Sequence, residues 1–295
     1  MVSKPIPGLT RAPTTDLPVM LPFNPRAGAH DPLFVSRWLA GIPPHYIAAL
    51  LIIWPVAGFA QGVNYTIGDA FEALWRWIPF LTFQGFLFNI LISLFAMLIG
   101  TAAGAGLGLA QISQSRFVRA LAWFVTQLFR NSPWLVLLFI VLLAFPFQIT
   151  IFGITIPIPG WVKAVIGLSL PIMANISEIV RGAVQSVPSA QWEAAESLSF
   201  TRTQTLWQII LPQCFKRMIP PWMNWYAILT MATPLCSLLG VGENINFTRQ
   251  AMEAEGNRPE LLVPFFGYSL VLFFAYCYPI ARFTIALEKR FALKL

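Results

Sequence analysis

The chain has few charged residues and a large excess of apolar ones. Asp, Glu, Lys and Arg make up 11% of its 295 residues, whereas 57% are hydrophobic. Soluble domains carry about 25% charged residues, so this composition excludes an ordinary soluble protein. The apolar stretches are continuous rather than alternating, which favours membrane helices over the strands of a barrel. We therefore predict an all-α polytopic membrane protein.

Residues that bind metals or carry out covalent catalysis are also scarce. The chain has two histidines, His30 and His45, and its three cysteines show no CxxC spacing. No cluster of His, Cys and carboxylates matches a metal site, and a membrane-embedded enzyme would lack a nucleophile and its base. The chain also lacks a GxxxxGK[ST] phosphate loop. We therefore predict no catalytic, cofactor-binding or metal-binding residue.

Six apolar segments approach the roughly 20 residues that span a bilayer. A signal peptide is not predicted, because polar, proline-rich residues precede the first of them. The third segment is interrupted at Asn131-Ser132-Pro133, so residues 117–130 are expected partly at the membrane interface and residues 133–145 across it. The six segments are 45–60, 86–110, 118–146, 162–183, 222–241 and 261–285.

The distribution of basic residues predicts the orientation in the membrane. The N-terminus, the 111–119 turn, the 181–217 loop and the C-terminus can share one side of a six-span chain. That side then holds every Lys and Arg except Arg76, Lys163, Arg249 and Arg258. The positive-inside rule makes it the cytoplasmic side. The net charge of +7 therefore reports topology, and no nucleic-acid partner is predicted.

Polar residues within the apolar segments mark a candidate pathway or gate, because such residues usually face the bundle interior. Hydrogen bonding between helices is the alternative for most of them, and a structural ion pair is the alternative for Glu178 and Arg181. The candidates are Asn89, Ser93, Glu178, Arg181, Asn224, Thr230, Thr233 and Ser237.

Glycines recur every four residues in the second span, at Gly100, Gly104 and Gly108. This spacing lets two helix backbones approach closely in lipid. Packing within the chain and contact with a second membrane subunit are both compatible with it.

Residues 186–213 form the longest polar interruption between two apolar segments. Thr201 and Gln204 have the T-x-x-Q spacing of a capping box. We expect two short helices, at about 188–198 and 202–211, with the second ending near Pro212. The loop could lie at the membrane interface, or dock as a knob in a groove of a soluble partner.

The chain resembles the membrane (permease) subunits of bacterial ATP-binding-cassette importers of the polar amino-acid type. Their loop signature is EAA, three residues, Gly, nine residues and I-x-L-P. Residues 178–188 are similar to the family's E-I-x-R-G-x-x-x-S-V-P run, and the resemblance covers about 85–290. The residues on the loop signature are Glu193, Ala194, Ala195, Ile209, Leu211 and Pro212, with Ser199 at the glycine position.

The resemblance implies the fold of a type I ABC importer transmembrane domain in the bacterial cytoplasmic (inner) membrane. This fold would have about six helices, a five-helix core plus one N-terminal helix. The divisions are a cytoplasmic N-terminal tail (1–41), an extra first span and outer loop (42–84), the transmembrane domain (85–290) with the coupling loop 186–213, and a cytoplasmic C-terminal end (291–295).

The resemblance also implies partners and roles. Two cytoplasmic ATP-binding subunits would use ATP and Mg, a second permease subunit would complete the pathway, and an extracytoplasmic binding protein would deliver an amino acid. The signature residues, Ser199 included, would couple the membrane subunit to the ATPases, with Glu193 in a charged contact and Ala194 and Ala195 allowing close approach.

The chain departs from the family pattern at two places. Ser199 replaces a glycine, and residues 231–235 read Met-Ala-Thr-Pro-Leu where the family usually has K-[DN]-T-S-L. These departures favour a heterodimer over a homodimer and leave open another small polar solute, such as an opine or compatible solute. An ion-driven secondary transporter is disfavoured, because we find no inverted repeat and no buried mid-span carboxylate.

Overall fold

The computed structural model describes residues 65–151 and 154–291. The predicted tail at 1–41, the predicted span at 45–60 and both histidines lie outside the described residues. Most of the predicted C-terminal end at 291–295 does so as well.

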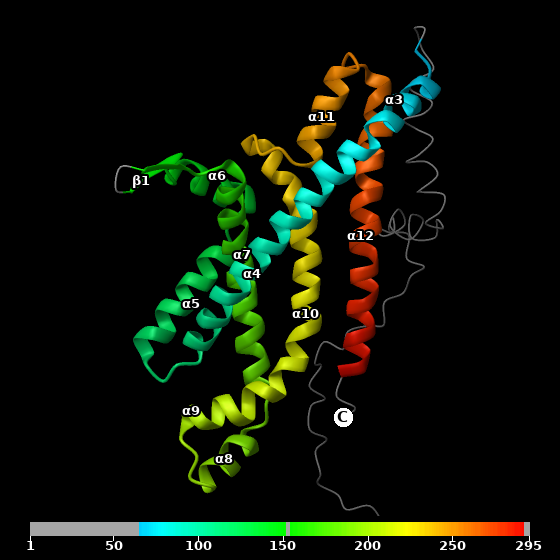
Figure 1. The fold of residues 1–295 in the computed structure, drawn as a ribbon. Helices are drawn as coiled ribbons and strands as arrows, with labels where there is room; N and C mark the ends of the chain where they lie inside the picture. Colours follow the sequence, from blue (N-terminus) through cyan, green and yellow to red (C-terminus); the bar gives the residue numbers. More distant parts are fainter. Residues whose placement is uncertain (1–64, 152–153, 292–295) are drawn as a thin grey trace, which may run out of the picture. The chain divides into compact units, whose positions relative to one another are not determined.

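The described chain begins with one long helical stretch (Figure 1). Helix α3 (Ile67–Phe80) starts at a capping box between Thr66 and Asp69, passes through the π-turn η1 (Leu81–Phe86) and continues as α4 (Leu87–Gln111). Residues 42–84 were expected to hold an extra first span and an outer loop, and the described part of this region is helical from Ile67 onward. The capping box starts the helix, and α3 buries Ala70, Ala73 and Leu74 in a cluster with residues near 251 and 265.

The third predicted span is a bent pair of helices. Helix α5 (Arg116–Arg130) and helix α6 (Trp134–Ala144) meet at 104°, at the predicted break. At 1.5 Å per residue, α6 is roughly 16 Å long, about half the hydrocarbon thickness. Helix α6 alone is therefore shorter than a full span, and α5 and α6 together count as one span at most.

A two-stranded antiparallel hairpin follows the bent pair. Strands β1 (Gln148–Ile151) and β2 (Ile154–Pro157) pair with Gln148 opposite Pro157. The next helix, α7 (Gly160–Gln185), starts with a buried lysine. Lys163 is 1% exposed, and its Nζ donates to the carbonyls of Phe145 at 2.9 Å and Leu142 at 3.2 Å. It thereby supplies hydrogen bonds to carbonyls at the end of α6.

The glycine repeat of α4 packs against α7. A Cβ atom on Gly104 would lie 2.6 Å from the carbonyl oxygen of Met173 and 2.8 Å from the Cβ atom of Ile176. Gly100 meets Ile172 and Gly108 meets Val180 in the same way, so the two helices run parallel. Packing within the chain therefore explains this repeat, and this glycine face is not available to a second subunit.

The predicted polar loop contains helix α8 (Ser189–Ser197) and helix α9 (Arg202–Gln204). The second helix does not end near Pro212, as we expected, but continues through the π-turn η2 (Thr205–Ile210) into α10 (Leu211–Ala232). In a regular α-helix the ring of Pro212 would clash with the carbonyl four residues before it. The π-turn pairs residues five apart, which accommodates the proline.

The last part of the chain contains the two remaining spans. Helix α10 leads into the 3-10 helix η3 (Thr233–Leu239), and α11 (Asn244–Ala254) follows with a 51° bend. A short 3-10 turn, η4 (Pro259–Leu261), precedes helix α12 (Leu262–Phe291).

Within the described residues, three helical stretches are long and apolar enough to span a membrane, or five if each bent pair counts as one span. They correspond to the five predicted segments from 86 onward and confirm the all-α polytopic fold. The α4–α5 turn, the α8–α9 loop and the end of α12 lie toward the same end of the bundle, at the bottom of Figure 1.

Candidate functional site

Ser199 ends α8 in a left-handed conformation. Its φ is +59°, its N–H donates to the carbonyl of Glu196 at 2.8 Å, and the N–H of Phe200 donates to the carbonyl of Ala195 at 3.1 Å. These bonds form a Schellman motif, in which glycine is the usual residue because it has no Cβ. The left-handed conformation that favours glycine at this signature position is therefore kept here, although the residue is a serine.

The next helical segment starts as the sequence predicts. Thr201 and Gln204 form the reciprocal bonds of a capping box. The turn between α8 and α9 therefore has backbone bonds on one side and a side-chain cap on the other, which fixes its path.

The signature residues divide between an inner and an outer face of the loop. Ala195 is 2% exposed, whereas Glu193 and Ala194 are exposed. Ala194 faces outward and could allow a partner to approach closely, as predicted. Ala195 is covered within the chain, so a partner cannot contact it.

Two of the other apolar signature positions also face inward. Ile209 and Leu211 pack against a buried cluster of Val184, Val187, Ile210 and Cys214, which joins the loop to the ends of α7 and α10. Pro212 is exposed.

Two large apolar side chains lie on the outer face of the loop. Leu198 is 72% exposed and Trp207 is 59% exposed. Together with Glu193 they give the loop a surface with exposed apolar area and one exposed negative charge. Such a surface suits docking into a groove of another protein. The sequence analysis missed both residues, although each is an apolar residue within a polar loop.

Glu178 connects α5 and α7. Arg181 Nη2 donates to its Oε2 at 2.6 Å, and Arg130 Nη1 lies 3.6 Å from the same oxygen. The predicted pair is therefore present and is joined by a residue next to the α5–α6 break. Arg181 also donates to Gln185 Oε1 at 2.7 Å.

A buried polar network connects α4, η3 and α11. Asn89 Nδ2 donates to Thr233 Oγ1 and to Glu243 Oε2, both at 2.8 Å, and Asn89 Oδ1 accepts from the N–H of Asn244 at 2.9 Å. Glu243 is 0% exposed and caps α11 by accepting from the N–H of Asn246.

The remaining pathway candidates do not converge on one cavity. Ser93, Thr230 and Ser237 each donate to a carbonyl three or four residues earlier in the chain. This satisfies their hydroxyl groups within their own helical segments. Asn224 is the one predicted candidate that lines the groove between α10 and α12.

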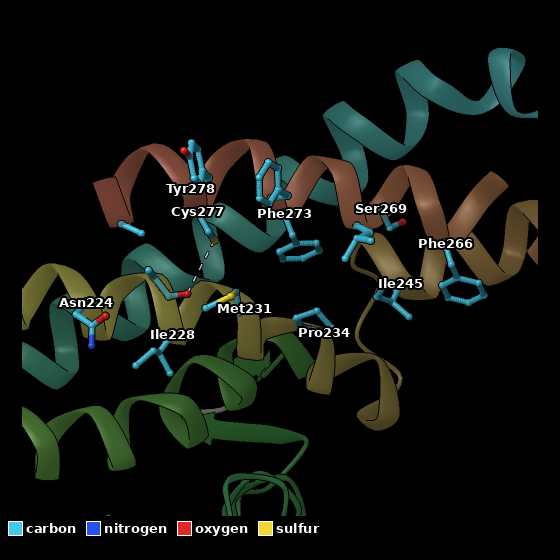
Figure 2. Close-up of a pocket in the computed structure, with 14 residues that line it drawn as sticks. Asn224, Ile228, Met231, Pro234, Ile245, Phe266, Ser269, Phe273, Cys277 and Tyr278 are labelled. Atoms are coloured by element: carbon cyan, nitrogen blue, oxygen red, sulfur yellow. Dashed lines mark hydrogen bonds between the residues drawn. The ribbon is translucent and has the colours of Figure 1, made fainter. Parts of the chain in front are cut away.

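That groove has a volume of about 610 Å³ and an apolar wall (Figure 2). Asn224, Ile228 and Met231 contribute from α10, and Phe273 and Tyr278 from α12. No charged residue is among the described residues that line it. Met231 stands where the family usually has a lysine, so this groove has no cation to bind a substrate carboxylate.

The described residues contain no group of three or more His, Cys, Asp or Glu side chains that could hold a metal ion.

Comparison with protein families gives one match over most of the membrane part. The model of the binding-protein-dependent transport system inner membrane component matches residues 100–281.

Two relatives come from Bacillus subtilis strain 168. The probable amino-acid ABC transporter permease protein YckA is 34% identical over 71% of this chain and 88% of its own length. The L-cystine transport system permease protein TcyB is 29% identical over 80% of this chain and 87% of its own.

Two solved structures share the fold. A crystal structure of an amino acid ABC transporter with histidines has a TM-score of 0.63 and 21% identity, over 78% of this chain and 100% of the other. An inward-facing structure of the MetNI methionine ABC transporter has a TM-score of 0.56 and 17% identity, over 73% and 98%.

Proposed function

Because the chain belongs to the family of inner membrane components of binding-protein-dependent transport systems, we propose that it forms half of the translocation pathway of an ATP-driven importer for a polar amino acid. Members of this family are non-catalytic permease subunits of ABC transporters in the inner membrane. An ion-driven secondary transporter is therefore no longer an alternative.

The α8–α9 loop carries the proposal that this subunit couples to an ATPase. Its inner face is fixed to α7 and α10 by the cluster around Ile210 and Cys214, while Glu193, Leu198 and Trp207 face outward. A force on the outer face therefore reaches two membrane helices through packed side chains. ATP and Mg would be used by two cytoplasmic ATP-binding subunits, each receiving a loop of this kind.

The groove between α10 and α12 supports a pathway that two subunits build together. Its apolar wall carries exposed Leu270 and Phe274 and lacks a charged residue for an amino-acid zwitterion. We propose that a second permease subunit, different from this one, contributes the charged contacts, and that an extracytoplasmic binding protein delivers the substrate.

The two named relatives make a polar amino acid the leading substrate candidate, and the residue at position 231 supports a second class of substrate. The relatives named above include amino-acid and L-cystine permeases. Met231, however, leaves the usual lysine position uncharged, so an opine or compatible solute is the second candidate. Uptake assays should therefore use labelled polar amino acids together with a betaine and an opine.

The coupling role is tested by Glu193→Lys in the native host. Reversing the charge of an exposed docking residue should reduce ATP-dependent uptake at least about tenfold, because a charged contact contributes about 1.5–3 kcal/mol. Membrane insertion should be unchanged, because the side chain is exposed. Glu72→Lys, an exposed glutamate on α3, is the charge-matched control. Normal uptake by the Glu193 variant would refute the coupling assignment.

A further inference from the structure

A second cavity lies where the α8–α9 loop meets the membrane helices. It has a volume of about 480 Å³, within the range of small-molecule sites. The ends of α4 and α7, the first turns of α5, and α8, α9 and η2 all contribute to its wall. Neither the predicted pathway residues nor the outer face of the loop takes part in it, except through the shared helix α8.

Two arginines line this cavity without a carboxylate partner. The ion pairs within the described residues engage Arg76, Arg130 and Arg181, and so leave out Arg119 and Arg202. No Asp or Glu is among the described residues of the cavity wall. The wall therefore has an excess of positive charge, which favours an anion.

Both arginines are exposed, and each guanidinium has one neighbour that leaves donors free. Arg119 Nη1 donates to the carbonyl of Ser113 at 3.1 Å, which uses one of its five N–H groups. The Cζ atom of Arg202 lies 5.2 Å from the centre of the Trp192 ring, a cation–π contact that uses none of its N–H groups.

The other polar groups of the wall also offer donors. Gln185 uses its Oε1 to accept from Arg181, so its amide nitrogen keeps two N–H groups. Ser189 opens α8 after Pro188, which provides no side-chain cap, and a helix N-terminus carries unpaired N–H groups and a partial positive charge.

We propose that this cavity binds a phosphate group. The residues that carry its donors belong to α5, α7, α8 and α9, so the wall offers donors from four separate helices. A phosphate has three or four acceptor oxygens and can bond to two arginines and further donors at once, whereas a carboxylate offers only two oxygens. The group belongs either to free inorganic phosphate or to the head of an anionic phospholipid, because the cavity lies at the end of the membrane helices α4 and α7.

The test uses the full-length chain in nanodiscs and measures its thermal unfolding midpoint. In one arm, inorganic phosphate is titrated into discs of pure phosphatidylcholine, against chloride at equal ionic strength. In the other arm, phosphatidylglycerol replaces part of the phosphatidylcholine without added phosphate. Binding to the folded chain alone raises the midpoint, by an amount that grows with the logarithm of the ligand concentration once this exceeds the dissociation constant.

Arg119→Gln and Arg202→Gln should each weaken the binding at least about tenfold, because each removes charged hydrogen bonds. Arg116→Gln is the matched control, because Arg116 is exposed on the first turn of α5 and does not line the cavity. Arg202→Gln is the decisive variant, because Arg119 also holds the carbonyl of Ser113 and its loss could alter folding.

The outcomes separate the sources and can refute the proposal. A shift with free phosphate that Arg202→Gln abolishes identifies a site for the soluble ion. A shift with phosphatidylglycerol alone, also abolished by Arg202→Gln, identifies a lipid headgroup site. The proposal is wrong if the wild-type chain shows no shift in either arm, or if the Arg116 and Arg202 variants lose the shift equally.

Discussion

Ser199 holds a backbone conformation that L-residues with a Cβ adopt at a cost. At φ = +59° the left-handed region costs a non-glycine residue about 1–2 kcal/mol. Part of any gain from glycine is lost through the greater freedom of the unfolded chain. Ser199→Gly should therefore stabilise the protein by about 0.5–1 kcal/mol, measured as a higher thermal midpoint in detergent.

Ser197→Gly, two positions earlier, provides the opposite control. Ser197 is the last residue of α8 and its hydroxyl donates to the carbonyl of Glu193, so glycine there should destabilise by up to about 1 kcal/mol. If both glycine variants lowered the midpoint, the left-handed strain at Ser199 would not be limiting.

Residues with local partners could be predicted from the sequence, and residues with distant partners could not. The capping box of Thr201 and Gln204 and the pair of Glu178 and Arg181 each join residues three apart, so their spacing is visible in the chain. The partners Asn89 and Glu243 are 154 residues apart. Nothing in a single sequence indicates that these two polar side chains share one buried network.

At the scale of helices, the contact between α4 and α7 depends on missing side chains. Gly104→Leu should destabilise the protein by about 3 kcal/mol, because a Cβ atom would already lie 2.6 Å from a backbone oxygen of α7. The thermal midpoint and the yield of folded protein would both fall. Gly106→Leu is the control on the same helix, since no atom lies within 4 Å of a Cβ added there. Equal effects of the two substitutions would contradict the packing argument.

The end of α6 depends on the buried Lys163. Lys163→Met keeps the length of the side chain but removes two hydrogen bonds to carbonyls and the contact of Nζ with the Phe147 ring at 3.6 Å. We expect a loss of about 2 kcal/mol in the free energy of unfolding. Lys216→Met, at an exposed position, should change it little. A stable Lys163 variant would show that water can replace the ammonium group.

The sequence predicts a helix break correctly where no other local feature offsets the effect of a proline. The Asn131–Pro133 break was predicted correctly, because proline disrupts a helix interior. Pro212 has the same chemistry but does not end its helix, because the preceding π-turn accommodates it. Helix α3 was missed, although the Thr66–Asp69 spacing marks its start; only its packing against residues near 251 and 265 is invisible in the local sequence.

At the scale of the whole molecule, the second permease can be counted directly. Affinity purification of the tagged chain from its native membrane, followed by mass spectrometry, should recover one copy of this chain, one different permease and two copies of an ATP-binding subunit. The apolar groove between α10 and α12, which lacks a charged residue in the described chain, is the physical reason for expecting a different partner. Two copies of this chain without another permease would refute the heterodimer.

The parallel contact of α4 and α7 has a mechanical consequence. Gly100, Gly104 and Gly108 of α4 each contact a β-branched side chain of α7, which are Ile172, Ile176 and Val180. The glycines and the side chains that pack on them therefore repeat at the same interval of four residues. If α7 slid along α4 by less than one helical turn, these β-branched side chains would clash with the α4 side chains between the glycines. The two helices therefore move as one rigid pair. Any motion of the subunit must occur at the breaks between helices, such as residues 112–115 and 131–133.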